Sequence, residues 1–404
     1  MKTRWAACKS SRAVRRASLV VVSLLGSAAL LSGGGLTGVL PNGSSTGSAQ
    51  ADAVSDTEAV IIELTAPIEC KVIGGYDFVN GDADPADDAG HGTHVAAIAA
   101  GNGALNGVAP EAQILAYKVL DQNGIGTTSD VIAAIERATD PDGDSDPSDH
   151  ATVINLSLSH PGTEDDPDSI AVDNASALGV LSVVAAGDGS GFFTIGAPGS
   201  ARTALTVGAT DDADQVASFS SGGPTAVERL IKPEIMAPGV DICAARWSGD
   251  LSGTACLDTS HAEHSGTSMA APHVAGAAAL LRGLRPSLTP AVTKAILQEA
   301  AVLLPGLSVT RVGAGRLDVR AAGDVETAIT PAPLNFGVDS DASGTWVRTV
   351  VLTIHNLGSA AKTYTLRTAD PLPAGITGSV TPNPSRSHLG PPQMLRCRWW
   401  WTTS

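Results

Sequence analysis

Residues 265–276 read SGTSMAAPHVAG and carry the most specific pattern in the chain. Ser268 follows a Gly-Thr turn and precedes a long apolar run, so we expect it to open a helix that continues to Leu284. A hydroxyl at a helix N-terminus lies beside free backbone N–H groups and the positive end of the helix dipole, which stabilise a developing oxyanion. Ser268 is therefore a candidate nucleophile.

A second block, residues 90–96 with the sequence GHGTHVA, places His91 just before another predicted helix. Its glycines let the backbone approach closely. A histidine that can take the proton of a serine hydroxyl is the requirement for nucleophilic acyl transfer. Each of the two blocks therefore places a reactive side chain at a helix start, with His91 as a candidate base and Ser268 as a candidate nucleophile.

Both blocks resemble those of the subtilisin family of serine proteases, in which the catalytic residues follow the order Asp, His, Ser. The resemblance runs from Lys71 to Ala322 and implies a subtilisin-like endopeptidase with the roles given above for His91 and Ser268. It also implies that the Ser268 backbone amide and Asp188 form the oxyanion hole. The family's substrate-lining strand corresponds to residues 152–158, so substrate contacts are expected from Asn155, Leu156, Ser157 and Leu158.

The aspartate of this family is missing from its usual place. The family carries a strand ending in Asp-Thr-Gly or Asp-Ser-Gly before the histidine, and no such triplet lies between Ala51 and His91. Glu58–Pro67 instead resembles the opening strand of the family's propeptide, joined directly to Lys71. The loss of the aspartate strand would open the sheet and leave the backbone of its neighbours unpaired. The loop carboxylates that precede the histidine receive no catalytic assignment; they are Asp77, Asp82, Asp84, Asp87 and Asp88.

Asp188 is a second departure, because it stands where the family usually has an asparagine that donates to the oxyanion. An ionised carboxylate repels the developing charge, and one lost donor costs about 10²–10³ in rate. A protonated Asp188 still donates. A local substitution without consequence is the alternative. In subtilisin the triad aspartate is worth about 3 × 10⁴ in turnover, against about 2 × 10⁶ for serine or histidine, so weak hydrolysis without it is expected.

Strands and helices alternate through this region. Val/Ile-rich strands are predicted at 114–120, 152–158, 180–185 and 204–209, and helices at 94–100, 129–138, 169–178, 268–284 and 290–301. This order predicts an α/β, three-layer subtilisin-like fold with a mainly parallel sheet flanked by helices. The β-branched run Thr345–Ile354 predicts a partial β-sandwich after it.

Five segments are expected along the chain. They are a signal peptide with linker (1–51), a remnant of a propeptide-like strand (52–70), the peptidase domain (71–323), an incomplete β-sandwich of fibronectin or immunoglobulin type (324–390) and an aberrant tail (391–404). Basic residues up to Arg16 precede the apolar run Ala17–Leu31, and residues 49–51, AQA, offer a cleavage site. A permanent N-terminal anchor is the alternative. The tryptophan-rich tail resembles neither a strand nor a linker.

Charge and cysteine usage narrow the class further. A net charge of −16 with only 25 Lys and Arg argues against a nucleic-acid partner. We expect a secreted monomer that meets protein or peptide substrates and has no stable membrane span after signal removal. Cys243 and Cys256 are placed to form a disulfide, or remain free, whereas Cys70 and Cys397 have no obvious partner.

One acidic loop is a candidate metal site. Its carboxylates stand at alternate positions, as oxygen-ligated calcium sites require; they are Asp140, Asp142, Asp144 and Asp146. A solvated surface loop without an ion is the alternative. His91 and His94 lack the spacing of a zinc pair. The predicted reaction itself requires no cofactor.

Two hypotheses about function follow. The intact histidine and serine blocks favour a secreted serine endopeptidase that works through an acyl-enzyme. The missing aspartate turn and the unusual C-terminus favour a catalytically inactive secreted protein, either a binding module or the product of a disrupted gene.

Overall fold

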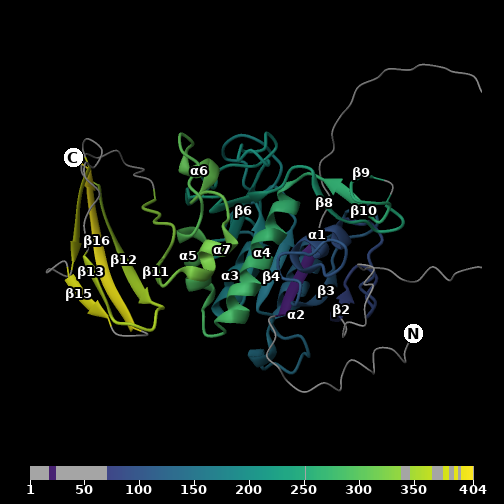
Figure 1. Ribbon diagram of the computed structural model, residues 1–404, viewed down its shortest axis with the longest axis horizontal. Helices are drawn as coiled ribbons and strands as arrows, with labels where there is room; N and C mark the ends of the chain where they lie inside the picture. The colour runs from purple at the N-terminus through teal and green to yellow at the C-terminus, as the bar shows by residue number, and fades with distance from the viewer. Residues whose placement is uncertain are drawn as a thin grey trace, which may run out of the picture.

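A seven-stranded parallel sheet forms the centre of the main domain (Figure 1). The computed structural model describes residues 18–23, 71–250, 252–337, 346–365, 376–381, 386–389 and 393–403. Neighbouring strands follow the order β2-β3-β1-β4-β5-β6-β7 and are parallel throughout. Their bounds are Ser18–Ser23 (β1), Val72–Asp77 (β2), Gln113–Lys118 (β3), Val153–Ser157 (β4), Leu181–Ala185 (β5), Leu205–Thr210 (β6) and Ile235–Pro238 (β7). The predicted α/β class with a parallel sheet is confirmed.

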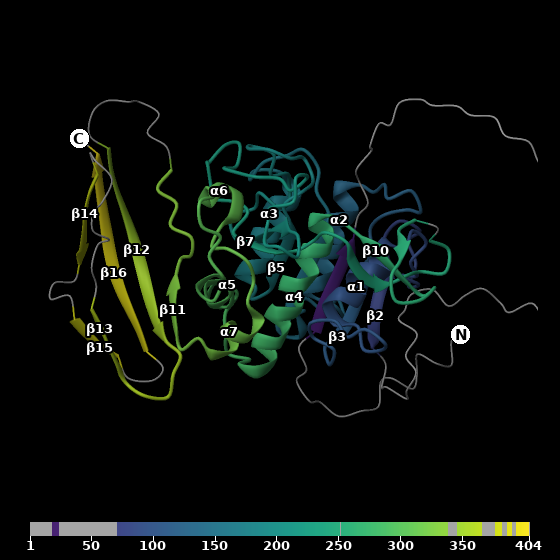
Figure 2. The same ribbon diagram turned by 45° about the horizontal axis from the view of Figure 1, so that its top comes forward.

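Helices cover both faces of this sheet (Figures 1 and 2). One face carries α1 (His91–Ala100), α4 (Thr267–Leu284) and α5 (Pro290–Glu299), and the other carries α2 (Thr128–Thr139) and α3 (Pro167–Ala177). Strand β4 shows the division. Val153 packs into the core with α1 and α4, whereas Ile154 and Leu156 pack with α2 and α3. Because successive strand residues alternate between faces, Ser157 lies on the α4 face.

Small residues bring α1 and α4 together. A Cβ at Gly276 would lie 2.7 Å from the carbonyl oxygen of Ala99, so only glycine permits this approach. Helix α4 is built largely from buried alanines and two glycines. The two helices that begin at the predicted catalytic blocks therefore pack side by side (Figure 2).

Strand β1 differs most from the sequence-based expectation. Ser18–Ser23 belongs to the apolar run that was assigned to a cleaved signal peptide, yet it pairs with β3 on one side and β4 on the other. The opening expected in the sheet is closed by this strand. The physical reason is that an interior position needs an extended apolar strand with both edges paired, and the valine-rich sequence SLVVVS supplies one. A strand in this position cannot be removed without opening the sheet.

The C-terminal strands also correct a prediction. Gln393–Thr403 (β16) pairs along its full length with Trp346–Asn356 (β12), and its other edge pairs with Ile376–Thr381 (β14). The segment called an aberrant tail is thus an interior antiparallel strand, because both of its edges find partners. Thr327–Thr330 (β11) completes this sheet, and Lys362–Thr365 (β13) pairs with Arg386–Leu389 (β15).

The C-terminal sheet lies beside α5 (Figure 1). The side-chain nitrogen of Gln298 donates to the Ala332 carbonyl oxygen at 3.1 Å, and the backbone N–H of Ile231 donates to the side-chain oxygen of Asn335 at 2.7 Å. These bonds connect the start of the C-terminal region to the peptidase domain. The shorter elements are η2 (Pro147–Asp149), α6 (Val309–Val312) and α7 (Val319–Asp324).

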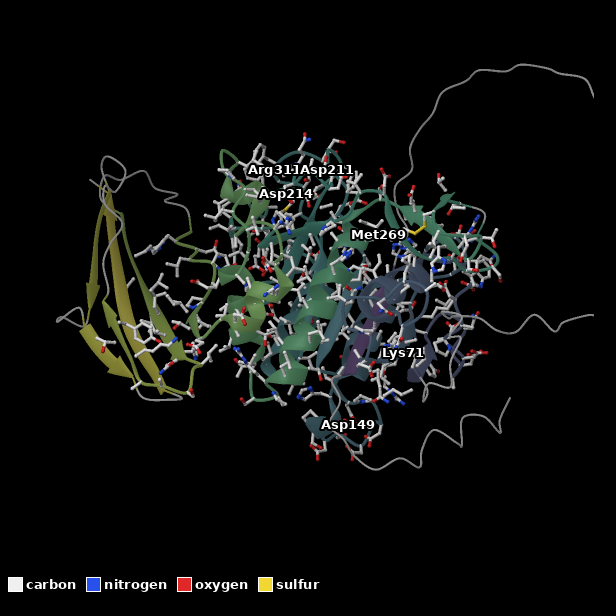
Figure 3. The ribbon with its side chains drawn as sticks, in the orientation of Figure 1. Lys71, Asp149, Asp211, Asp214, Met269 and Arg311 are labelled. Carbon is white, nitrogen blue, oxygen red and sulfur yellow. A yellow bond between two sulfur atoms is a disulfide. The ribbon has the colours of Figure 1, made fainter. Side chains whose placement is uncertain are left out.

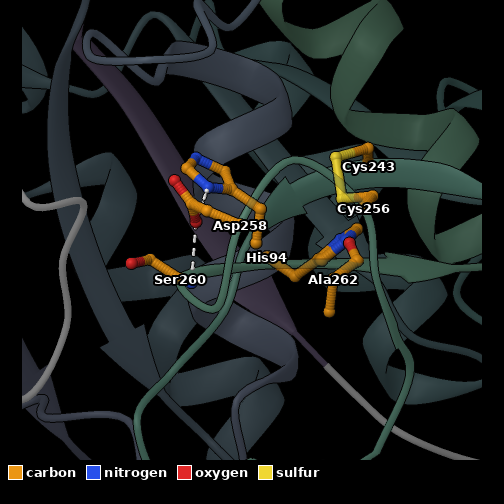
Figure 4. The surroundings of a disulfide bond; sticks show 7 residues. His94, Cys243, Cys256, Asp258, Ser260 and Ala262 are labelled. Atoms are coloured by element: carbon orange, nitrogen blue, oxygen red, sulfur yellow. Dashed lines mark hydrogen bonds and ion pairs between the residues drawn. A yellow bond between two sulfur atoms is a disulfide. The ribbon is translucent and has the colours of Figure 1, made fainter.

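A disulfide joins Cys243 to Cys256, which confirms the predicted pair, with 5.9 Å between the Cα atoms (Figure 4). Cys243 lies on β8 (Ile242–Ala245), which pairs with β10 (His261–His264); β9 (Thr254–Ala255) pairs with β10 on the other side. The carbonyl oxygen of Ala262 bonds to the ring of His94 at 2.9 Å, which attaches this small sheet to α1. The predicted Glu58–Pro67 strand and Cys70 lie outside the described residues. Among the helices of the described part, none has the length and apolarity needed to cross a bilayer.

Residues 18–23 are expected to be necessary for folding. A chain that begins at residue 52 should lose cooperative thermal unfolding, because the unpaired backbone groups of β3 and β4 cost about 1–3 kcal/mol each against a typical net stability of about 5–15 kcal/mol. A chain that begins at Ala17 is the matched control and should unfold like the full chain. Circular dichroism during heating measures both. Equal melting temperatures for the two shortened chains would contradict the assignment of β1.

Candidate active site

Ser268 lies in the first turn of α4, at the carboxyl end of strand β4. Its Oγ donates to the carbonyl oxygen of Ser157 at 3.3 Å, and the Ser157 Oγ donates to the carbonyl oxygen of Ser268 at 2.7 Å. Asn155 supports this contact, since its side-chain nitrogen donates to the Ser157 Oγ at 3.0 Å. The predicted nucleophile is therefore held at a fixed place on the sheet and at the N-terminal end of a buried helix.

His91 is the first residue of α1, and Asp87 holds that helix start. One Asp87 oxygen accepts from the Gly90 amide at 2.9 Å, and the other accepts from the amide and hydroxyl of Thr93, both at 2.7 Å. The Nδ1 atom of His91 is buried and has no hydrogen-bond partner among the described residues. Burial lowers the pKa of His91 to about 3, opposed by Asp87 and assisted by His94 and His264. His91 is thus a neutral base over a wide pH range.

No carboxylate among the described residues bonds to His91. Asp77 caps its own turn through the amides of Val79 and Asn80, and Asp77 and Asp88 both pair with Lys118, at 3.4 and 3.3 Å. Asp82 accepts from the amide of Asp84 at 2.9 Å. The carboxylates that make these bonds therefore stabilise the loop and the start of α1. This agrees with the sequence analysis, which gave them no catalytic role.

The carboxyl end of β1 lies level with the nucleophile. In the parallel register Ser23 pairs with Ser157, the residue that contacts Ser268. Strand β1 also packs against both α1 and α4. The backbone of β1 thus ends, at Ser23, level with the strand residue that contacts the nucleophile.

A cavity of about 620 Å³ lies beside Ser268. Of the four residues predicted to contact substrate, Ser157 and Leu158 line it. Asn155 and Leu156 are fully buried and do not line it, which corrects the prediction. Leu156 points to the α2 and α3 side of the sheet, and Asn155 acts on Ser157 from within the core.

Asp188 lines the same cavity as Ser268, as its predicted oxyanion role requires. Its Oδ1 accepts two hydrogen bonds of 2.9 Å from Thr267, one from the amide and one from the hydroxyl. Burial raises the pKa of Asp188, and the bonds from Thr267 oppose this shift. Thr267 itself was not singled out from the sequence; its place directly before Ser268 is the only signal that could have found it.

His160 forms another part of the cavity wall. Its Nε2 lies 2.8 Å from the carboxylate of Asp168, which is 1% exposed, and its Nδ1 lies 3.0 Å from the Pro161 carbonyl oxygen. Both neighbours are acceptors only, so the doubly protonated ring satisfies both contacts. Burial is the largest single influence on His160 and lowers its pKa, but the bonds to Asp168 and Pro161 and the charges of Asp168 and Asp166 together outweigh it, so the pKa of His160 is raised. The partner residue, eight positions away, was not predictable from spacing.

The acidic loop lies far from the nucleophile. Figure 3 places Asp149 at the lower edge of the domain, well away from Met269, the residue after Ser268. Carboxylate oxygens of Asp140, Asp142 and Asp149 lie within 4.8 Å of one another. Asp144 and Asp146 are not part of this group; like Asp140 and Asp142, they accept from amides of their own loop, at 2.7 and 3.0 Å. Calcium at this loop stays a prediction, with Asp149 as an added candidate ligand.

Calcium binding should be visible as a change in stability. If the loop holds calcium, a chelator lowers the melting temperature, because the ligand stabilises only the folded chain. Asp142→Asn is the matched variant and should melt at the chelated value with or without added calcium. Differential scanning calorimetry gives both temperatures. A melting temperature of the unaltered chain that does not respond to the chelator would remove the calcium hypothesis.

Comparison with known proteins agrees with this geometry. The model of the subtilase family of peptidases matches residues 62–331, and the chain belongs to that family. The chain is 37% identical to serine protease AprX of Bacillus subtilis over 254 residues, 57% of each chain. It is 39% identical to subtilisin DY of Bacillus licheniformis over 228 residues, covering 55% of this chain and 73% of the relative.

A solved structure shows the same likeness to subtilisin-like proteases. A cold-adapted subtilisin-like serine proteinase superposes with a TM-score of 0.51 at 27% identity, over 75% of this chain and 86% of the other. The chain spans only 57% of the length of AprX.

Proposed function

We propose that this protein is a serine endopeptidase that hydrolyses peptide bonds through an acyl-enzyme. The observation that carries the proposal is the placement of Ser268 at the N-terminal end of α4, beside Asp188 and a cavity large enough for a substrate side chain. Helix α1, which begins at His91, packs directly against α4. Membership of the subtilase family supports the same reaction.

The proposed reaction uses side chains and one backbone amide of this chain, together with water. Neutral His91 takes the proton of the Ser268 hydroxyl, and the serine oxygen forms a bond to the peptide carbonyl carbon. The carbonyl electron pair moves to its oxygen, which the Ser268 amide and Asp188 stabilise. The intermediate collapses, the C–N bond breaks, and the leaving amine takes the proton from His91. Water then repeats the sequence on the ester and releases the acid product and free Ser268.

The catalytically inactive alternative rests on one feature. The buried Nδ1 of His91 has no partner among the described residues, so nothing there fixes the orientation of the ring or stabilises its charged form. The absence of this support predicts slow turnover and leaves peptide binding in the cavity intact. A protein that binds peptides without cleaving them is therefore the second candidate.

We also propose that the protein acts outside the cell as a monomer, on protein or peptide substrates. The basic N-terminus followed by Ala17–Leu31 supports export. Since β1 lies within that run, the domain described here requires the run to stay attached after export. The net charge of −16 supports a soluble extracellular protein rather than a nucleic-acid partner.

Peptide hydrolysis should depend on both residues. Ser268→Ala is expected to abolish cleavage of an internally quenched peptide library, and His91→Ala should lower the rate by at least about 10²-fold because the general base is lost. Ser265→Ala is the matched control. Its hydroxyl bonds to Asp241, away from the cavity, and its loss should leave the rate unchanged. Cleavage that survives in Ser268→Ala, or binding without cleavage in the unaltered chain, would reject the proposed protease.

A further inference from the structure

Among the described residues, one carboxyl oxygen of Asp188 has hydrogen-bond partners and the other has none. Oδ1 takes both hydrogen bonds from Thr267, and no hydrogen bond involving Oδ2 is recorded among the described residues. Oδ2 lies 3.2 Å from the point that a Cβ on Gly266 would occupy, in the turn that leads into Ser268. The free oxygen is therefore directed toward the start of α4, on the wall of the substrate cavity.

A carboxyl group at this place can act in two opposite ways. As an ionised carboxylate it only accepts hydrogen bonds, so it repels the negative charge that forms on the carbonyl oxygen. As a neutral acid it keeps Oδ1 as the acceptor for Thr267 and offers a proton on Oδ2. Only the neutral form can assist the reaction.

We propose that this protease works in acid solution, with the protonated carboxyl of Asp188 as the hydrogen-bond donor to the oxyanion. The proposal rests on the proposed peptidase function and adds its pH range. In the reacting complex the Oδ2–H group donates a hydrogen bond to the oxyanion and keeps its proton, so the proton balance of the acyl transfer is unchanged. The serine proton still moves to His91 and then to the leaving amine.

The groups around Asp188 determine how readily it holds a proton. Burial raises the pKa of Asp188, whereas Thr267 and the positive end of α4 favour the ionised form. Ser268 and Ser221, which also line the cavity, are uncharged. His160 is the other titratable group on the cavity wall, and its charge is offset by Asp168 at 2.8 Å. The net result is that the pKa of Asp188 lies above its ordinary value.

The base remains usable in the same range. Burial lowers the pKa of His91 to about 3, so the ring is neutral above that value. The charges that face it are Asp87 and His94 on its own segment and His264, which is paired with Asp250 at 3.3 Å. Activity therefore rises as pH increases through about 3, when His91 becomes neutral, and falls as pH increases through the raised pKa of Asp188, when the donor is lost.

The test compares the pH profiles of kcat/KM for the full chain, Asp188→Asn and Asp188→Ala with one quenched peptide. The unaltered chain should have its maximum in acid solution, above the pKa of His91 of about 3 and below neutrality. Asp188→Asn should lose the alkaline fall and gain about 10²-fold at neutral pH, because the amide donates at every pH. Asp188→Ala should lose the acid activity and gain nothing at neutral pH.

Other outcomes distinguish acid operation from the peptidase function itself. A neutral or alkaline maximum in the unaltered chain, or an Asp188→Asn profile of the same shape, overturns acid operation while the peptidase stands. Inactivity of all three proteins at every pH rejects the peptidase. In that case NMR titration of the Asp188 carboxyl decides the inference, since a pKa at or below the ordinary 3.8 overturns it and a pKa above 3.8 supports it.

Discussion

The position between β3 and β4 must be filled by a strand for this site to exist. An empty position would leave the facing edges of both neighbours without hydrogen-bond partners inside the domain. Ser18–Ser23 fills it and pairs along both edges. Strand β4 then holds Ser157 at the level where it contacts Ser268, and α1 and α4 pack across the completed surface. The geometry of the nucleophile therefore depends on a segment more than two hundred residues away.

The two departures from the family pattern are physically related. A carboxylate bonded to His91 would stabilise the imidazolium form. Without one, burial is the largest influence and lowers the pKa of the ring, while Asp87 opposes the shift and His94 and His264 add to it. Burial also raises the pKa of Asp188, which stands where the family usually has an amide donor, and so favours the form that can donate. The lowered pKa of His91 and the raised pKa of Asp188 widen the pH range in which a neutral base and a protonated donor coexist. At neutral pH an ionised Asp188 cannot donate to the oxyanion. At lower pH a neutral His91 and a protonated Asp188 can act together.

The residues near the chemistry were predictable because local sequence determines them. The blocks around His91 and Ser268 combine glycine turns with helix starts, and the structure places each at the first turn of its helix. The parallel sheet followed from the alternation of apolar strands and helices. Two of the four predicted substrate contacts were wrong, because strand alternation buries Leu156 on the far side and Asn155 beneath Ser157.

Pairing between distant segments was not predictable. The run that forms β1 has the basic flank and apolar composition of a leader, and its valine-rich stretch fits either a leader or an interior strand. The tryptophan-rich end was likewise rejected as a strand, although β12 and β14 give it partners on both edges. In both cases the partner strands, rather than local propensity, determine the conformation. The contact between His160 and Asp168 is local, but it was not predictable either, because it depends on the conformation of the loop that joins β4 to α3.

The most direct test of this account is the rate at which a fluorophosphonate labels Ser268 in Ser23→Asp, with Ser23→Asn as the uncharged control of similar size. If β1 ends beside the catalytic pair, the new carboxylate can accept from the Nδ1 atom of His91, which has no partner among the described residues. The account predicts faster labelling by up to about 10⁴-fold, in Ser23→Asp alone, with labelling absent when Ser268→Ala is added. Equal labelling of the Asp and Asn variants, in proteins shown to be folded, would contradict the placement of β1 and the site built on it.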